Sequence, residues 1–352
     1  MTSLLSILTA QMRVLLVGPP GIGKTARIAA AARAMNRRLI VMRASLSERV
    51  DFGGCLVPDQ AAGVTRALPL ELLRDLRSTP EPTLLFLDDL GQAPIDVQAA
   101  LMRLFDAGEL SPQVLICGAT NRPGDKAGVS CLCEPLRSRF DCAFAIPTPA
   151  DTAPRTDGVV TLGTWSDELE GWCQWAADAG APAEVIAWHR STSGLGLGLE
   201  KGMAGALYAW RTHADPAQRF PDFRSWHTVC RLWDAGLRDL HTIGSTIGLG
   251  PAQPFLAFAR LADGLPTPQQ IWMDPLGANV PADPGQLYLV ASMLAQAAEH
   301  KFAGPFCKYI DRLPQIFGAL AARDVYRRLG AKLSANPDWQ KWWVKNQDLF
   351  VS

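Results

Sequence analysis

The residues with the clearest chemical potential form a glycine-rich segment near the N-terminus, Gly18-Pro-Pro-Gly-Ile-Gly-Lys-Thr25. The spacing G-x-x-x-x-G-K-[ST] lets the backbone curl so that its N–H groups point at phosphate oxygens, while the lysine reaches the β- and γ-phosphates and the threonine hydroxyl binds Mg²⁺. An alanine-rich helical pattern follows, and the positive end of that helix strengthens the site. The predicted nucleotide-binding residues are Gly18, Pro19, Pro20, Gly21, Ile22, Gly23, Lys24, Thr25 and Ala26.

Two acidic residues, Asp88 and Asp89, directly follow the apolar run Leu84–Leu87. A carboxylate at the tip of a buried strand can bind the metal beside a phosphate loop, so Asp88 is predicted to hold Mg²⁺, through water, together with Thr25. Asp89 is placed to orient or deprotonate an attacking water. Apolar strands often end in aspartate, but the pairing with an upstream phosphate loop favours phosphoryl-transfer chemistry.

Polar and basic residues follow at the next two strands. The fourth strand ends Cys117-Gly-Ala-Thr-Asn121, where the Asn121 side chain either bonds the γ-phosphate or the attacking water, or simply occupies a turn. Arg137 and Arg139 precede a fifth apolar run. Arginine stabilises the charge on a phosphoryl group in transfer, although either arginine taken singly is better interpreted as a surface cation near the start of a strand.

The elements that must position these residues alternate between short apolar strands and helical patterns. The predicted strands are Val14–Val17, Leu39–Met42, Leu84–Leu87, Val114–Cys117 and Ala143–Ile146. This alternation predicts an α/β fold with a five-stranded parallel sheet and helices on both faces. Ligands of such sheets bind at the carboxyl ends of the strands, where the phosphate loop falls.

The chain changes character near residue 150, at the Pro/Asp/Thr/Gly-rich stretch 147–158, and all eleven tryptophans lie at Trp165 or later. The later part is predicted to be all-α, with a glycine-rich loop and a proline-rich connection (264–283) between helices. The expected helices cover 167–179, 182–189, 225–240, 254–262, 284–299 and 309–329. Trp342 and Trp343, flanked by lysines, are either core residues or a patch that faces a partner.

Composition argues against several classes of function. The formal net charge is zero, which gives no sign of nucleic-acid or membrane binding, and no apolar stretch approaches the length of a membrane span. Eight cysteines without regular spacing indicate reduced thiols in a cytoplasmic protein. The close group Cys131, Cys133 and Cys142 matches zinc-ligand spacing poorly.

The order of these parts resembles the AAA+ ATPases, and within them the MoxR-like, dynein-related branch. The segment Leu87-Asp-Asp-Leu-Gly-Gln-Ala-Pro94, continued by Val97-Gln-Ala-Ala-Leu101, is similar to that branch's acidic pair and following helix. Ala119–Arg122 and Leu136–Phe140 match in place. Phe220-Pro-Asp-Phe-Arg-Ser-Trp226 resembles the lid segment of MoxR-type proteins.

The resemblance implies a P-loop AAA+ core at 1–150 with a hairpin insert near 51–70, a helical lid domain at 151–245 and a C-terminal helical region at 246–352. It implies ATP and Mg²⁺ as ligands, Asn121 as sensor 1, and Arg224 as a sensor-2 arginine reaching from the lid. Arg139, or alternatively Arg137, would be the arginine finger. A finger supplied to a neighbouring subunit requires a homo-oligomeric ring, most often a hexamer.

Three functions follow as hypotheses. The first is an ATPase ring that remodels a partner protein, which in this family often carries a von Willebrand factor A domain. The second is a nucleic-acid motor or loader, disfavoured by the neutral charge, although Arg49 and Arg66 could line a basic pore. The third is a slowly hydrolysing, nucleotide-gated scaffold. It is suggested by Asp89, because the resemblance implies glutamate there and aspartate is one methylene shorter.

Overall fold

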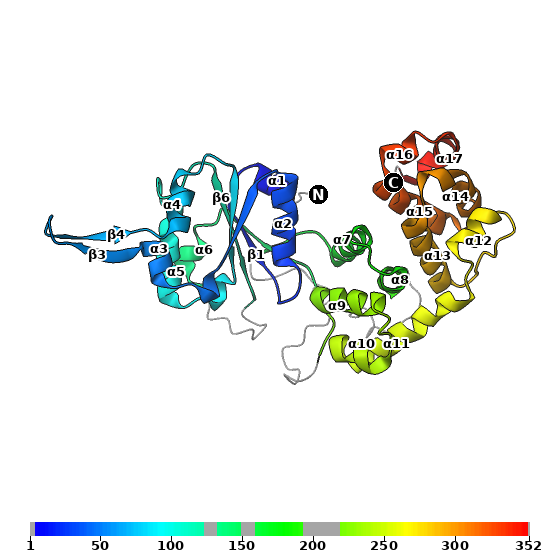
Figure 1. Cartoon of the computed structure of the whole chain (residues 1–352), viewed down its shortest axis with the longest axis horizontal. Helices are drawn as coiled ribbons and strands as arrows, with labels where there is room; N and C mark the ends of the chain where they lie inside the picture. The colour runs from blue at the N-terminus through cyan, green and yellow to red at the C-terminus, as the bar shows by residue number, and fades with distance from the viewer. Residues whose placement is uncertain (1–3, 123–131, 149–158, 193–218, 351–352) are drawn as a thin grey trace. The chain divides into compact units, whose positions relative to one another are not determined.

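A computed structural model describes residues 4–122, 132–148, 159–192 and 219–350. These residues divide into two compact units, one ending at residue 165 and one beginning at residue 166, and each is described by itself. Figure 1 shows both units and labels most of their helices and several of their strands. Among the helices that the structure describes, none combines the length and the hydrophobicity that a membrane-spanning segment requires.

The first unit is built on a six-stranded sheet whose strands run parallel in the order β2-β5-β6-β1-β7-β8. The predicted α/β fold with its parallel sheet is confirmed, and all five predicted strands are present. The sixth, β8, has only two residues, which is too short to leave a periodic pattern in the sequence. The strands are β1 (Val14–Val17), β2 (Arg38–Arg43), β5 (Thr83–Asp88), β6 (Val114–Thr120), β7 (Cys142–Ala145) and β8 (Val160–Thr161).

Helices cover both faces of this sheet, as Figure 1 shows. Because successive side chains of a strand point to opposite faces, Leu16 and Phe86 pack with α1 and α2 on one side, while Leu15 and Leu85 pack with α3, α4 and α5 on the other. The interior strand β5 is buried along its whole length. The helices are α1 (Leu4–Thr9), α2 (Lys24–Ala34), α3 (Arg49–Gly53), α4 (Glu71–Ser78), α5 (Ile95–Leu101) and α6 (Glu134–Arg137), with short 3₁₀ helices η1 (Ala44–Leu46), η2 (Leu90–Gln92) and η3 (Met102–Phe105).

A separate two-stranded hairpin, β3 (Cys55–Asp59) and β4 (Val64–Leu68), projects from the first unit beside α3 (Figure 1). Its turn is held by Asp59, whose carboxylate accepts hydrogen bonds from the Ala62 N–H (3.1 Å) and the Arg66 guanidinium (2.9 Å). The backbone hydrogen bond from Ala62 and, to a smaller extent, the bond from Arg66 lower the pKa of Asp59. Apolar side chains of the hairpin are exposed, with 73% of Leu56 accessible to solvent.

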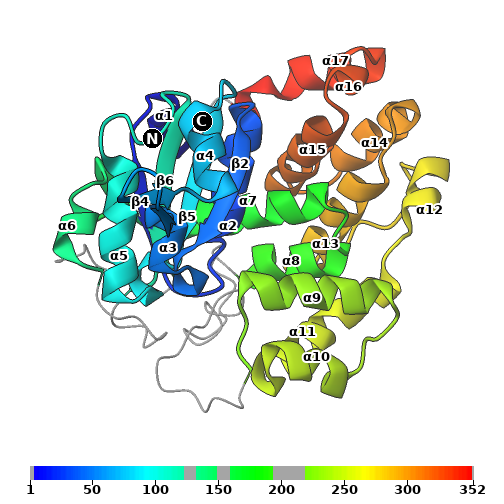
Figure 2. The same ribbon diagram turned by 60° about the vertical axis from the view of Figure 1, so that its left-hand side comes forward.

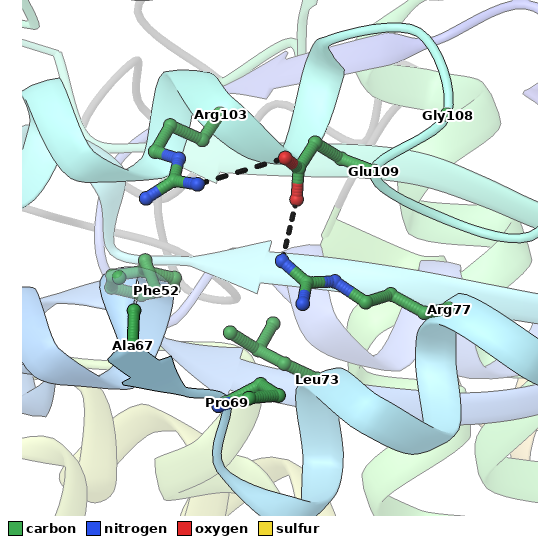
Figure 3. A pocket seen from close by; sticks show the side chains of 9 residues that line it. Phe52, Ala67, Pro69, Leu73, Arg77, Arg103, Gly108 and Glu109 are labelled. Carbon is green, nitrogen blue, oxygen red and sulfur yellow. Dashed lines mark hydrogen bonds and ion pairs between the residues drawn. The ribbon is translucent and has the colours of Figure 1, made fainter. Parts of the chain in front are cut away.

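A cavity of about 440 Å³ lies at the root of the hairpin, between α3, α4 and the segment after η3 (Figure 3). Phe52 and Leu73, both buried, form its apolar part. On its polar side Glu109 accepts a bond from Arg77 (2.7 Å) and lies 3.6 Å from Arg103. The one carboxylate therefore ties α4 to η3 beneath the hairpin.

The second unit is entirely helical in the described residues, and its core surrounds α13, which packs against α8 and α15 (Figure 2). Polar side chains cap several N-termini: Asp222 caps α9, Asp239 caps α10, Thr267 caps α12, Asp283 caps α13 and Asn336 caps α17. The helices are α7 (Trp165–Asp178), α8 (Ala183–Thr192), α9 (Phe223–Asp234), α10 (Leu240–Ile247), α11 (Leu249–Ala259), α12 (Pro268–Met273), α13 (Pro284–Ala297), α14 (Ala303–Ile310), α15 (Gln315–Leu329), α16 (Ala331–Ser334) and α17 (Pro337–Asn346), with 3₁₀ helices η5 (Arg260–Gly264), η6 (His300–Phe302) and η7 (Gln347–Phe350).

Three predicted helix boundaries in this unit are wrong. The helix expected over 309–329 is two helices, because Pro314 cannot continue α14 and instead precedes α15. The helix expected over 225–240 ends at Asp234, since Gly236 adopts a left-handed conformation (φ 77°). The connection 264–283 contains the capped helix α12.

Trp342 belongs to the core, so the partner-facing alternative is wrong for this residue. Only 5% of Trp342 is exposed, its ring stacks 5.3 Å from that of Trp339, and its indole N–H donates to Asp311 (2.7 Å). Asp311 also pairs with Lys345 at 2.8 Å. Trp342 and Lys345 therefore fix α17 to the C-terminal end of α14, which Asp311 caps.

Charged residues inside the second unit tie three of its helices together. The guanidinium of Arg190 (α8) donates to Asp324 (α15) at 2.6 Å and to Glu170 (α7) at 3.0 Å. Arg190 and Asp324 are both buried. Burial opposes ionisation of Glu170, but Arg190 and Arg323 together outweigh it and lower the pKa of this carboxyl.

We expect Asp324→Ala to lower the free energy of unfolding of the second unit by about 3 kcal/mol, because it leaves a buried guanidinium with one carboxylate instead of two. Tryptophan fluorescence during urea unfolding measures this, since every tryptophan lies at residue 165 or later. The exposed pair Lys301–Glu299 supplies a control, and Glu299→Ala should cost less than about 0.5 kcal/mol. A loss below about 1 kcal/mol for Asp324→Ala would contradict the prediction.

The stability that Glu170 contributes depends on pH, because the pKa of its carboxyl is lowered in the folded protein. This stability is present above the ordinary pKa of 4.5 and is lost as the pH falls through the folded-state pKa.

Candidate nucleotide-binding site

The phosphate loop, residues 18–25, connects the carboxyl end of β1 to the first turn of α2. Gly21 and Gly23 have φ angles of 74° and 86°, a region that favours glycine. Space at Gly18 is tight, since a Cβ added there would lie 3.2 Å from Ile22 and 3.4 Å from Ile146. The loop conformation therefore accounts directly for two of the three glycines, Gly21 and Gly23.

Lys24, the first residue of α2, turns its ammonium group back into the loop. It donates to the carbonyl oxygens of Gly18 (2.9 Å) and Pro19 (3.1 Å) and to the side-chain oxygen of Asn121 (2.6 Å). Both Lys24 and Asn121 are buried. The loop lysine and the polar tip of β6 are thus brought together across 97 residues of sequence.

Thr25 and Asp88 form the second contact of the site. The Thr25 hydroxyl donates to one carboxylate oxygen of Asp88 at 2.8 Å, and the other oxygen accepts the Asp89 N–H at 3.1 Å. A hydroxyl and a carboxylate are hard oxygen donors of the kind that Mg²⁺ prefers. The pair predicted to hold the metal is therefore assembled at the carboxyl ends of β1 and β5.

Asp89 lies directly after β5 in a left-handed conformation, with φ 57° and ψ 37°. Among residues other than glycine, aspartate and asparagine are the ones that tolerate this region best. The conformation turns the chain sharply from the strand into η2. Its role with the attacking water stays a prediction.

Arg137 and Arg139 lie in residues 133–140, which we call the arginine segment. Arg137 pairs with Glu134 at 2.8 Å and Arg139 with Asp106 at 3.0 Å, and all four side chains are substantially exposed. In the described residues neither arginine bonds to the phosphate loop. The arginines are therefore available at the surface of the first unit rather than directed into its own site.

The arginine segment is anchored to the sheet by Phe140. A Cβ added to Gly118 of β6 would lie 2.6 Å from the Phe140 ring and 2.7 Å from Leu90. The Phe140 ring also meets Phe105 edge-on at 5.2 Å. Sequence reasoning did not identify Gly118 as a packing position, although a glycine within a strand is a signal of close approach.

Two further residues near the site were missed from sequence. Gln98 of α5 is fully buried and hydrogen-bonded through both ends of its amide. Cys117 of β6 is buried, and burial, together with the nearby charge of Asp88, raises the pKa of its thiol. That thiol therefore stays protonated at neutral pH.

The remaining predicted site residue, Arg224, lies in the first turn of α9 in the second unit, where it is exposed. The neighbouring Asp222 caps this helix by accepting the Ser225 N–H at 2.6 Å. Of the three cysteines considered for zinc, Cys133 and Cys142 are free thiols and Cys131 lies outside the described residues. Among the described residues no group of three or more metal-ligating side chains gathers.

The known proteins to which this chain is similar include several ATPases. Residues 14–148 match the family "ATPase family associated with various cellular activities (AAA)". The ATPase histone chaperone abo1 of Schizosaccharomyces pombe is 30% identical over 174 residues, which are 45% of this chain and 13% of abo1. The human ATPase family gene 2 protein homolog B is 33% identical over 251 residues, 66% of this chain and 31% of that protein.

The chain therefore spans less than a third of the length of these two relatives. Among solved structures, the AAA domain of FIGL-1 in complex with ADP is 18% identical and superposes with a TM-score of 0.34, covering 71% of this chain and 72% of that one. The family match spans the phosphate loop, Asp88, Asn121 and Arg139. The part of the chain from residue 14 to residue 148 is a domain of the AAA ATPase family.

Proposed function

We propose that this protein binds ATP with Mg²⁺ and hydrolyses it to ADP and phosphate. The observation that carries the proposal is the bonded group formed by Lys24 with Asn121 and by Thr25 with Asp88. These residues come from the carboxyl ends of β1, β5 and β6, which are neighbours in the sheet. This arrangement of a lysine, a hydroxyl, a carboxylate and an amide at one edge of the sheet supports the proposed binding of phosphate and Mg²⁺.

The proposed roles divide the reaction among the residues of this group. The N–H groups of the phosphate loop and the Lys24 ammonium bind the phosphates, and the carbonyls of Gly18 and Pro19 orient that ammonium within the loop. Thr25 and Asp88 hold Mg²⁺, which neutralises charge that develops on the phosphate oxygens. Asp89 accepts the proton of the attacking water or orients it, and Asn121 bonds the γ-phosphate or that water.

We further propose that the arginine completing the site comes from a neighbouring subunit of a homo-oligomeric ring, a hexamer in our assignment. Arg139 is exposed and pairs with the exposed carboxylate of Asp106, and pairs of that kind contribute less than about 1 kcal/mol. The free energy needed to separate Arg139 from Asp106, so that it can reach a neighbouring subunit, is therefore small. In the same proposal residues 151–245 form a lid that carries Arg224 as a sensor, and residues 246–352 form a C-terminal helical region.

We propose that this ring remodels a partner protein, as the resemblance to the MoxR-like branch implies. The proposed partner class is a protein with a von Willebrand factor A domain. Hydrolysis changes the contacts of Asn121, Arg139 and Arg224 with the γ-phosphate and so shifts the equilibrium between subunit arrangements. The exposed apolar hairpin offers a surface for such a partner.

A nucleic-acid motor is the second candidate, and the charge of the hairpin region speaks against it. Residues 48–68 contain two basic side chains, Arg49 and Arg66, and three acidic ones. Arg66 is moreover bonded to Asp59. A basic stripe that could follow a phosphate backbone is therefore lacking in this region.

We expect ATP turnover per subunit to rise steeply, by about tenfold or more, as the protein concentration increases from well below to well above micromolar, because an arginine supplied by a neighbour completes each site. Steady-state phosphate release, with sedimentation at the same concentrations, measures both turnover and assembly.

Substantial turnover that does not depend on concentration would show a site complete within one subunit. Tight ATP binding without turnover in the assembled ring would instead favour the nucleotide-gated scaffold. Stimulation by DNA that falls steeply with salt would favour the nucleic-acid motor.

A further inference from the structure

Gln98 forms a bridge inside the first unit. Its side-chain N–H donates to the Ala93 carbonyl oxygen at 2.9 Å, and its side-chain oxygen accepts the Cys133 N–H at 2.8 Å. The Gln98 side chain is fully buried, so its amide depends on these partners rather than on bulk water for its hydrogen bonds. Both polar ends of one buried amide are therefore used to hold two backbone positions together.

The two positions belong to the two chemical parts of the site. Ala93 ends η2, the short helix that begins after Asp89. Cys133 is the N-cap of α6 and begins the arginine segment. Gln98 thus connects the turn after the acidic pair to the start of the segment that carries Arg137 and Arg139.

The other end of the arginine segment is held by packing. Phe140 lies against Gly118 and Leu90, and Leu136 is fully buried between the two ends. An apolar contact fixes distance but tolerates rotation, whereas hydrogen bonds also fix direction. Of these contacts, the bond to Gln98 is the directional one that fixes the N-terminal end of the segment.

We propose that Gln98 is a positioning residue for the arginine that the chain presents to its neighbour's nucleotide. This inference rests on the proposed ATPase ring. Gln98 touches neither nucleotide nor metal, and it acts by keeping Arg139 at the height above the sheet that the neighbouring site requires. A displacement of about 1 Å in a catalytic group can cost about 100-fold in rate.

The first variant is Gln98→Met, which keeps the length of the side chain and removes both hydrogen bonds. We expect kcat to fall about 10- to 100-fold while the KM for ATP stays within about twofold, because the phosphate loop is unchanged. Gln113→Met, at an exposed glutamine before β6, is the control and should match the wild type.

The second variant removes the donor of the same hydrogen bond, the backbone N–H of Cys133. Cys133 has φ −64° and ψ 137°, a conformation that proline adopts without strain, so Cys133→Pro removes chiefly the N–H that Gln98 accepts. It should lower kcat as Gln98→Met does, and the double variant should lose little more than either single one. Cys133→Ala keeps the N–H and should turn over at least about tenfold faster than Cys133→Pro.

Mixed rings separate positioning from a general loss of structure. Gln98→Met subunits keep their own site but present a misplaced arginine, whereas Asp89→Asn subunits lack the base but present a normal arginine. In a one-to-one mixture about a quarter of all sites pair an intact base with a normal arginine, since each site has one donor neighbour in a head-to-tail ring. Turnover should therefore recover to about a quarter of the wild-type value. Arg139→Ala mixed with Asp89→Asn should recover in the same way.

Failure of the Gln98→Met mixture to recover, while the Arg139→Ala mixture does, would overturn the role of Gln98 and leave the shared site standing. Failure of both mixtures would overturn the shared site and this inference with it. A Gln98→Met variant with wild-type kcat would also overturn the inference.

Discussion

Replacing Arg139 with alanine is expected to lower the rate of ATP hydrolysis in the assembled ring by about 10³-fold or more, the range over which a transferred arginine acts. Arg139 pairs with Asp106 at 3.0 Å on an exposed surface. Its removal therefore disturbs no core contact, and ATP affinity should change little. Single-turnover hydrolysis at saturating ATP, combined with equilibrium binding of a fluorescent ATP analogue, separates these two effects.

Arg137→Ala is the matched comparison, because this arginine is also exposed and pairs with a glutamate one helical turn away. It should lower turnover at least about tenfold less than Arg139→Ala does. The reverse order would assign the transferred arginine to Arg137. Equal and small losses for both would contradict a shared site of this design.

Asp89→Asn is expected to lower hydrolysis by about 10²- to 10⁴-fold while ATP still binds, because the amide cannot accept the proton of the attacking water. Asparagine is suited to this test since, like aspartate, it adopts the left-handed conformation (φ 57°) found at residue 89. The backbone turn into η2, and with it the position of Asp88, should therefore be kept. Phosphate release and binding of the same ATP analogue measure the two properties.

Asp75→Asn, on the exposed face of α4, controls for the loss of one negative charge and should behave like the wild type. Wild-type turnover in Asp89→Asn would remove this residue from the reaction. It would also favour the scaffold hypothesis if the wild type itself turned over slowly.

The left-handed turn at Asp89 also bears on its identity. The resemblance to the MoxR-like branch implies glutamate here, yet glutamate populates positive φ less readily than aspartate does. The structure thus gives a conformational reason for the shorter side chain, in addition to any effect on rate. Asp89→Glu tests both, because it lengthens the arm while straining the turn.

The sequence by itself determined the parts of this protein that local patterns encode. The loop Gly18–Thr25 was predicted from its spacing alone, and the dihedral angles of Gly21 and Gly23 show why that spacing is needed. Strands such as β1 and β5 are short apolar runs, and burial on both faces of a parallel sheet produces such runs. Asp88 and Asn121 were found because each directly follows a run of this kind.

Only the tertiary structure decided which distant residues meet. The contact of Lys24 with Asn121, the pairing of Arg139 with Asp106, and the bridge from Gln98 to Cys133 join residues 97, 33 and 35 positions apart. No periodicity records such separations, because a hydrogen bond depends on distance and direction in space rather than on spacing along the chain. The same reason places Trp342 in the core and Gly118 beneath Phe140. The atoms that surround a side chain depend on how helices and strands pack together. The sequence of each helix or strand taken alone does not specify that packing.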